Sequence, residues 1–399
     1  MTLRLWAAGR SAMPLILVLQ TLRWPYPARK LQSAPWQAAF GLGLFNVRLL
    51  QIMAGARHGG AETFFVDLIG AVARRGVEQA AVTRAVPDRI ALLRRAGCHV
   101  DTARFGPPFD LVTRVKVHSV AAKFKPDVTL AWMNRAASFM PRGAHVAVGR
   151  LGGYYDLKYY RRCDALICNT TDIRDFAIAK GWPPSRVFHI PNFCPVGPEA
   201  AINRATVDTP DGVKVVLALA RLETSKGIDV AIRAVSQLDG VHLWIAGEGS
   251  ERTNLERLAV AAGIAGRVKF LGWRTDRSAL LRAADACVVA SRHEPFGNVV
   301  VNAWAHGTPL VATRSQGPAV LVQDGTDGLL VPVDNPTAMA DSLRRILTDS
   351  ETARGLAEAG QKRALTEFSE AGVTSQYLDV FTELIRLSGA DLPAPRAGA

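Results

Sequence analysis

Apolar residues from Val47 onward form short strand-like runs that alternate with stretches of helical periodicity. The first run, residues 47–53, leads through a turn of small residues into residues 62–76, where apolar positions recur at helical spacing before Gly76. Further strands are expected at residues 79–83, 126–132, 145–149, 164–169 and 186–190. Because strands alternating with helices form parallel sheets, the pattern predicts a Rossmann-like domain over residues 47–195.

A second alternation follows a stretch rich in proline and glycine, which we interpret as an interdomain linker. Strands are expected at residues 213–219, 241–246, 267–272, 285–290 and 309–313, and helices at 227–238, 251–262, 276–284 and 296–306. This pattern predicts a second Rossmann-like domain over residues 196–373, and an amphipathic helix at 374–388 is expected to pack back on the first domain. The fold class is therefore α/β, with two doubly wound domains and a cleft beyond the carboxyl ends of their strands.

The two ends of the chain differ from this pattern. Residues 1–46 carry basic residues, no acidic residue and several interleaved aromatic residues. An interfacial membrane anchor and a poorly ordered leader are both compatible with that composition, whereas a secretory signal would need a small-residue cleavage site that is missing. Residues 389–399 are expected to be a disordered tail. The chain contains no run of 18 apolar residues, so no membrane-spanning helix is expected.

Charge is unevenly distributed along the chain. The net charge is +13, and counting along the sequence assigns +15 to residues 1–200 and −2 to residues 201–399. The excess predicts an anionic partner for the first half, for which nucleic acid, an acidic lipid surface and phosphorylated substrates all qualify. The five cysteines include no C-x-x-C pair, which argues against a disulfide framework or zinc site and favours a reducing compartment.

Four loops at the carboxyl ends of the second set of strands carry candidate binding chemistry. Arg221 and Lys226 flank a helix N-terminus, which suits a phosphate or diphosphate. The next loop, residues 247–250, begins with a G-x-G that lets a ligand approach the backbone. The third contains Glu294 and Gly297 immediately before a helix, and the fourth spans residues 305–318. Each motif alone is weak, but all four are expected at one edge of one sheet.

Taken in order, these residues resemble the nucleotide-sugar domain of family-4 retaining glycosyltransferases, which have the GT-B fold of two facing Rossmann-like domains. The resemblance covers residues 47–388 and is most specific from Leu217 to Pro332. It implies catalytic roles for Glu294, Arg221 and Lys226, with Glu294 on the transferred sugar and the two cations on the donor diphosphate. The remaining donor-binding residues that it implies are Gly59, Gly60, Gly247, Phe270, Leu271, Phe296, Gly297, Asn298, Val299 and Asn302.

The chain departs from the family at two places. The family's E-x(7)-E pattern ends in a glutamate that holds the ribose hydroxyls, and here that position is Asn302. An amide replaces a charge-assisted hydrogen bond by a neutral one, which should weaken ribose binding. Where many relatives have a histidine after the strand at 126–132, this chain has Asn134 and Arg135, so no catalytic histidine is carried over. For His58, substrate contact and a spectator role both stay open.

The chain contains no D-x-D motif, and no metal or other cofactor is expected. Cations and a helix N-terminus can instead stabilise a departing diphosphate. We therefore expect a retaining, metal-independent hexosyltransferase that uses a UDP- or GDP-sugar and acts on a glycan or lipid-linked acceptor of the cell envelope.

A cytoplasmic location is expected, with peripheral contact to an anionic inner membrane face and no nucleic-acid partner. The alternative is a catalytically inactive GT-B protein that binds a membrane or nucleic acid, which Asn302 and the basic leader would favour. A nicotinamide dehydrogenase is disfavoured because no strand is followed by G-x-G-x-x-G.

Overall fold

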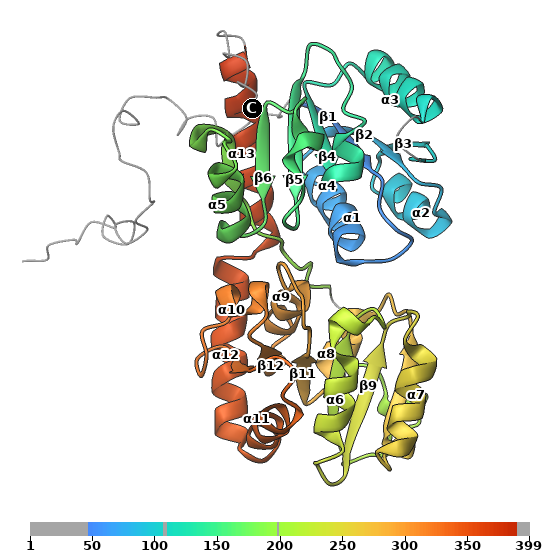
Figure 1. Cartoon of the computed structure of the whole chain (residues 1–399), viewed down its shortest axis with the longest axis vertical. Helices are drawn as coiled ribbons and strands as arrows, with labels where there is room; N and C mark the ends of the chain where they lie inside the picture. Colours follow the sequence, from blue (N-terminus) through green and yellow to red (C-terminus); the bar gives the residue numbers. More distant parts are fainter. Residues whose placement is uncertain (1–46, 107–109, 198, 389–399) are drawn as a thin grey trace, which may run out of the picture. The chain divides into compact units, whose positions relative to one another are not determined.

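The computed structural model describes residues 47–106, 110–197 and 199–388, and it contains two parallel sheets flanked by helices (Figure 1). The first sheet has seven strands in the order β3-β2-β1-β4-β5-β6-β7. Its strands are β1 (Arg48–Met53), β2 (Glu78–Thr83), β3 (His99–Thr102), β4 (Val128–Trp132), β5 (Val146–Leu151), β6 (Ala165–Cys168) and β7 (Val187–His189). Its helices are α1 (Gly60–Ala73), α2 (Pro87–Arg95), α3 (Leu111–Phe124), α4 (Met133–Ala137) and α5 (Thr171–Ala179).

The two faces of this sheet are covered by different helices. Leu49 and Met53 of β1 belong to a core cluster with α1 and the C-terminal helix α13 (Glu370–Ser388). Leu50 and Ile52 belong to a second cluster with α3, α4 and α5 on the opposite face. This alternation is the reason β1 is apolar on both faces, as a buried parallel strand requires.

The second sheet has six parallel strands in the order β10-β9-β8-β11-β12-β13. Its strands are β8 (Lys214–Leu219), β9 (Val241–Ala246), β10 (Val268–Gly272), β11 (Ala286–Val289), β12 (Leu310–Thr313) and β13 (Leu329–Val331). Its helices are α6 (Ile228–Val235), α7 (Arg252–Ala261), α8 (Arg277–Ala283), α9 (Asn298–Ala305), α10 (Gln316–Leu321), α11 (Pro336–Thr348) and α12 (Ser350–Thr366).

Val216 and Ala218 of β8 pack with α6, α7, α11 and α12, whereas Val215 and Leu217 pack with α8 and α9 on the other face. Both sheets thus reverse their strand order at one point, between β1 and β4 and between β8 and β11. The crevice beyond the carboxyl ends of the strands at such a switch point is where doubly wound sheets bind ligands.

Some elements of the structure have no counterpart in the sequence-based expectations. The edge strands β3 and β13 are short, and β3 (HVDT) has no buried residue. Without a continuous apolar run, β3 gives no periodic signal. Helices α11 and α12, which cover the second sheet, were also not predicted as separate elements.

The predicted anchor or leader at 1–46 and the predicted tail at 389–399 lie outside the described residues. Within the described part of the chain, no helix is long and apolar enough to cross a membrane.

Candidate functional site

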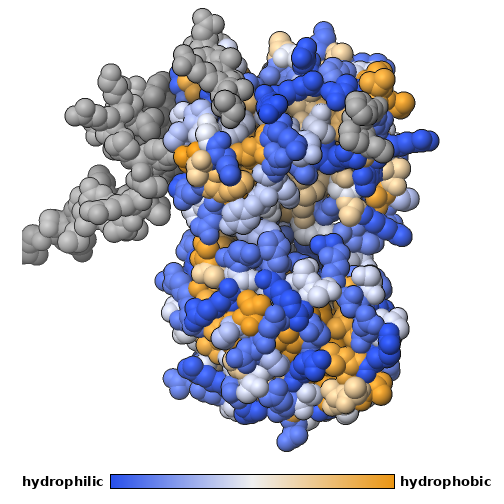
Figure 2. Space-filling view, in the orientation of Figure 1, coloured by the Kyte–Doolittle hydropathy of each residue, from blue (hydrophilic) through white to orange (hydrophobic). Residues whose placement is uncertain are grey.

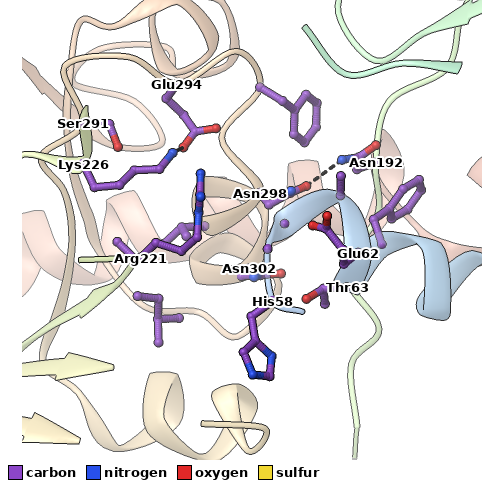
Figure 3. A pocket seen from close by; sticks show the side chains of 18 of the residues that line it. His58, Glu62, Thr63, Asn192, Arg221, Lys226, Ser291, Glu294, Asn298 and Asn302 are labelled. Atoms are coloured by element: carbon purple, nitrogen blue, oxygen red, sulfur yellow. Dashed lines mark hydrogen bonds and ion pairs between the residues drawn. The ribbon is translucent and has the colours of Figure 1, made fainter. Parts of the chain in front are cut away.

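A cavity of about 390 Å³ lies at the carboxyl ends of strands from both sheets (Figure 3). The first domain lines it with residues 56 and 58–64 after β1, together with residues at or after the ends of β4, β5, β6 and β7. The second domain contributes residues 219–221 and 226 after β8, residues 288–291 at the end of β11, and the start of α9. Segments distant in sequence thus meet where the topology of both sheets predicts a ligand.

Lys226 and Glu294 form an ion pair at this cavity, with Nζ 2.8 Å from Oε2. The two side chains are only 16% and 17% exposed, so the pair is shielded from solvent. The other carboxylate oxygen of Glu294 accepts a hydrogen bond of 3.2 Å from the backbone N–H of Gly297. The carboxylate is therefore fixed between an ammonium group and the backbone that precedes α9.

Arg221 also lines the cavity, but its guanidinium forms an ion pair with Glu223 and is 43% exposed. Gly227 holds the turn between Lys226 and α6 in a left-handed conformation (φ 62°), and a Cβ there would collide with the carbonyl oxygen of Ala290. Only glycine satisfies both conditions without strain. This close contact holds the loop after β8 against the end of β11. It therefore places Lys226 near Glu294.

The N-termini of α1 and α9 come close together at the cavity. A Cβ on Gly60, the first residue of α1, would lie 2.6 Å from Nδ2 of Asn298, the first residue of α9. Asn298 Oδ1 accepts a hydrogen bond of 2.6 Å from Asn192 Nδ2, across from the first domain (Figure 3). Two helix N-termini with free N–H groups provide positive potential for an anion such as a diphosphate.

Most of the predicted donor-binding residues line this cavity. Asn302 lies one helical turn after Asn298 on α9, so both amides lie on the same helix face. The predicted residues that line the cavity are Gly59, Gly60, Arg221, Lys226, Glu294, Phe296, Asn298, Val299 and Asn302.

Gly247, Gly297, Phe270 and Leu271 do not line the cavity. A Cβ on Gly247 would collide with the carbonyl oxygen of Ala220, so this glycine permits contact between two protein loops. Phe270 instead lies under the guanidinium of Arg252, 5.4 Å from ring centroid to Cζ. In the described structure the G-x-G therefore serves loop packing, and Gly297 reaches the site through its backbone N–H on Glu294.

His58 stacks on Trp273 of the second domain, with ring centroids 4.2 Å apart and an interplanar angle of 26°. Both rings line the cavity. Burial and the neighbouring Arg57 lower the pKa of His58 below its ordinary value of 6.5. A lowered pKa favours the neutral imidazole, which stacks on the Trp273 ring without a charge to desolvate.

Sequence reasoning did not single out several cavity residues of the first domain. Arg150 at the end of β5, Asn169 after β6 and Asn192 after β7 line the cavity and are 1%, 3% and 2% exposed. Asp67 of α1 pairs with Arg277 of α8 at 2.9 Å and joins the two domains beside the cavity. Burial raises the pKa of Asp67, and Arg277 opposes that shift. The only sequence signal for Arg150 is a charged residue inside an otherwise apolar run.

Each of the five cysteines is free and buried. Across residues 47–106, 110–197 and 199–388, no group of three or more His, Cys, Asp or Glu side chains has an arrangement that could hold a metal ion.

A seven-stranded and a six-stranded parallel sheet, with one cavity lined by both domains, define the GT-B architecture. Comparisons with known proteins lead to the same class. The family model described as glycosyl transferases group 1 matches residues 200–363, and the model for glycosyltransferase family 4 matches residues 58–196. The chain is 38% identical over 335 residues to the lipopolysaccharide core biosynthesis glycosyltransferase LpsE of Rhizobium meliloti, covering 81% of this chain and 96% of that protein. The corresponding protein LpsD of the same organism is 34% identical over 332 residues, covering 81% and 95%.

The chain therefore belongs to the group 1 and family 4 glycosyltransferases. Solved structures agree on the fold. Anabaena Alr3699/HepE, crystallised with UDP and glucose, superposes with a TM-score of 0.75 at 22% identity, covering 85% of this chain and all of that one. WaaG, described as a glycosyltransferase involved in lipopolysaccharide biosynthesis, gives a TM-score of 0.66 at 19% identity, covering 84% and 100%. The GT-B fold expected from the sequence is confirmed, and an inactive binding protein is not favoured.

Proposed function

We propose that this glycosyltransferase moves a hexose from a UDP- or GDP-sugar to a hydroxyl group of an envelope glycan or lipid-linked glycan, with retention of anomeric configuration. The observation that carries the proposal is the Lys226–Glu294 pair, which lies at the cavity together with the N-termini of α1 and α9. The names of LpsE and LpsD support an acceptor of the lipopolysaccharide core type. The UDP bound to the Anabaena protein supports a nucleoside diphosphate donor.

In this proposal the bond between the sugar anomeric carbon and the diphosphate oxygen breaks first. Lys226, Arg221 and the α9 N-terminus stabilise the negative charge that develops on the departing diphosphate. The acceptor hydroxyl oxygen then bonds to the anomeric carbon from the same face, and its proton passes to the departing phosphate oxygen. Glu294 orients the sugar through hydroxyl hydrogen bonds, and Asn302 binds the ribose.

We propose that the reaction needs no metal ion, because the protein cations can compensate the diphosphate charge. No other cofactor takes part in the proposed reaction. The proposal also includes a cytoplasmic location with peripheral contact to the inner membrane face. The free cysteines are consistent with a reducing compartment such as the cytoplasm. No nucleic-acid partner is proposed.

The proposed membrane contact is made by α3 and its surroundings. Leu111, Val112 and Val115 on one side of α3 are 68%, 76% and 68% exposed. Figure 2 shows hydrophobic surface over α3 with hydrophilic surface around it. Arg84, Arg104 and Lys116 line the same surface hollow as Val112. Apolar side chains surrounded by cations favour the surface of an anionic bilayer.

Thermal stabilisation by nucleoside diphosphates tests the donor proposal. At 100 times its dissociation constant, a ligand that binds only the folded protein adds about 2.7 kcal/mol to its stability. UDP or GDP should therefore raise the melting temperature in excess chelator, and Lys226→Ala should reduce that rise. No stabilisation by any nucleoside diphosphate would contradict the donor proposal, and stabilisation only with added Mn²⁺ or Mg²⁺ would contradict its metal independence.

A further inference from the structure

Arg150 is a buried cation without an acidic partner among the described residues. Its side chain is 1% exposed, and it belongs to none of the ion pairs in the described structure. Removing a guanidinium from water is costly unless hydrogen bonds or an anion compensate its charge. A buried arginine that lines a substrate cavity and has no carboxylate is therefore available to an anionic ligand.

The surroundings of Arg150 satisfy part of its hydrogen-bonding capacity and fix its orientation. Nε donates a hydrogen bond of 3.0 Å to the hydroxyl of Tyr377 on α13, and Nη2 donates to Oδ1 of Asn192. The guanidinium also lies over the rings of Trp132 and Phe64, 4.5 and 4.9 Å from their centroids. None of these partners carries a negative charge, and Nη1 has no hydrogen-bond acceptor in the described structure.

A second buried donor group lies beside Nη1. A Cβ placed on Gly152 would lie 3.5 Å from Arg150 Nη1 and 3.8 Å from Asn169 Nδ2. Asn169 is 3% exposed, and its Oδ1 is buried without a hydrogen-bond partner. Gly152, Arg150 and Asn169 all line the cavity. The missing side chain at Gly152 thus leaves space for a ligand atom that contacts both N–H groups.

We propose that Arg150, Gly152 and Asn169 form a subsite for an anionic group of the acceptor, either a carboxylate or a phosphate. A planar guanidinium and a neighbouring amide are well suited to the oxygens of both groups. The subsite belongs to the first domain, whereas the predicted donor-binding cations Arg221 and Lys226 belong to the second. This inference rests on the proposed function, and it specifies that function further: the enzyme selects an acidic sugar or a phosphorylated sugar as its acceptor.

The hydrogen bonds of Asn192 connect this subsite to the donor side. Asn192 accepts from Arg150 and donates to Asn298 at the start of α9. The acceptor's anion and the donor's diphosphate therefore bind at two ends of one chain of hydrogen bonds. A ligand in the subsite would add a contact to an Arg150 that is already oriented, and Asn192 would link that contact to the amide of Asn298.

Gly152→Ala is the informative variant because it fills the subsite without removing Arg150. The new methyl group would make only ordinary van der Waals contacts, so the protein should fold. Gly153→Ala is the matched control: its methyl group would likewise make an ordinary contact, 3.5 Å from the ring of Tyr155, and Gly153 does not line the cavity.

The kinetic test uses core oligosaccharide isolated from a strain that lacks this gene. It is offered intact, with its carboxylates amidated by methylamine, or with its phosphates removed. One of the two neutralised acceptors should show a KM at least tenfold higher than the intact acceptor with the wild-type enzyme. Gly152→Ala should raise the KM for the intact acceptor by a similar factor. On the neutralised acceptor that the wild type uses poorly, Gly152→Ala should cause no further rise in KM. Gly153→Ala should behave like wild type on every acceptor.

Which neutralised acceptor fails identifies the anionic group as carboxylate or phosphate. Equal use of all three acceptors, or equal behaviour of the two alanine variants, would overturn the subsite. Absence of transfer from every donor would count against the proposed function instead.

A binding experiment then tests the subsite independently of transferase activity. Glucuronate and glucose 6-phosphate serve as charged probes and glucose as the neutral one, titrated with UDP and GDP present to occupy the diphosphate-binding residues. One charged probe should bind the wild type and Gly153→Ala at least tenfold more tightly than glucose does, and Gly152→Ala should lose that preference. No preference for either charged probe would overturn the proposal.

Discussion

At the scale of single residues, the candidate donor site consists of charges that are already paired. Lys226 is bound to Glu294, and Arg221 to Glu223. In the proposed reaction, a donor diphosphate would compete with these carboxylates for both cations. The shielded Lys226–Glu294 pair is the more consequential one, because a diphosphate that draws Lys226 away leaves Glu294 available to sugar hydroxyls.

Replacing Lys226 by alanine should lower kcat/KM for transfer at least about tenfold, roughly 1.4 kcal/mol, because a cation that stabilises the leaving group is lost. Lys214→Ala is the matched control. Lys214 lies at the other end of β8, is 52% exposed and pairs with Asp285 at 3.3 Å. Steady-state kinetics with varied donor measures both variants, and equal activity of Lys226→Ala and Lys214→Ala would remove Lys226 from the site.

Asn302→Glu should tighten nucleotide binding by about 1 kcal/mol, because a charged acceptor for the ribose hydroxyls replaces an amide. Asn302 lines the cavity, so the new carboxylate can reach a bound nucleotide. Calorimetric titration of UDP and GDP measures the change. Unchanged or weaker affinity would place the ribose elsewhere.

Several of these residues could be recognised from the sequence, and others could not. Lys226, Glu294 and Asn298 occur in loops directly after apolar strands, so their shared sheet edge follows from the pattern alone. Arg150 and Asn192 come into the site through contacts over 42 or more residues: Arg150 with Asn192, and Asn192 with Asn298. No local period encodes such contacts. Gly247 and Phe270 are the opposite case: the local sequence marked both as donor-binding residues, but each contacts another part of the protein. Gly247 packs against the carbonyl oxygen of Ala220, and Phe270 lies under the guanidinium of Arg252.

At the scale of elements, strand and helix patterns were most informative where both faces are buried. β1, β4, β8 and β9 are mostly apolar and mostly buried, and they were predicted within a few residues. The edge strand β3 has no buried residue and gave no signal. Sheet order is a tertiary property, and the sequence predicted it only through the general preference of alternating strands and helices for doubly wound sheets.

Helix α3 allows an element-scale test of membrane contact. Val115→Asp should weaken binding to vesicles that contain anionic lipid, because a charge then replaces an apolar group that is 68% exposed. Val260→Asp on α7 is the control, since Val260 is also 68% exposed but lies on the other domain. Vesicle sedimentation should show weaker binding of Val115→Asp alone, and binding by wild type should fall with salt. Equal loss in both variants, or binding insensitive to lipid charge, would contradict the proposed contact.

At the scale of the whole molecule, buried histidines make stability depend on pH. Burial lowers the pKa values of His242 and His306 below the ordinary value of 6.5. Each ring has a buried nitrogen without a partner in the described structure, so protonation there would add an unsatisfied N–H. The unfolded chain therefore takes up these protons at a higher pH than the folded protein. Stability is retained above about pH 6.5 and is lost as the pH falls below it.

The melting temperature should accordingly fall between pH 7.5 and pH 5.5, measured by scanning calorimetry. His242→Gln should flatten that dependence, whereas His99→Gln, at an exposed position, should leave it unchanged. A melting temperature that stays constant over this range, or that rises on acidification, would contradict the prediction.

The contacts between the two domains beside the cavity include two polar pairs, Asp67 with Arg277 and Asn192 with Asn298, and the stacked rings of His58 and Trp273. The charge split along the sequence predicts an anionic partner for the first half, and the subsite proposed above would bind one at Arg150. The sequence could not indicate that place, because an arginine inside an apolar strand is equally compatible with a structural role.

The most direct test of the central claim follows the reaction itself by proton NMR. Purified protein is mixed in excess chelator with UDP- or GDP-sugars and core oligosaccharide from a strain that lacks this gene. We predict that one donor is consumed, that the new glycosidic linkage has the donor's anomeric configuration, and that Glu294→Gln abolishes transfer while nucleotide affinity persists. A product of inverted configuration, full activity of Glu294→Gln, or no consumption of any donor would contradict it.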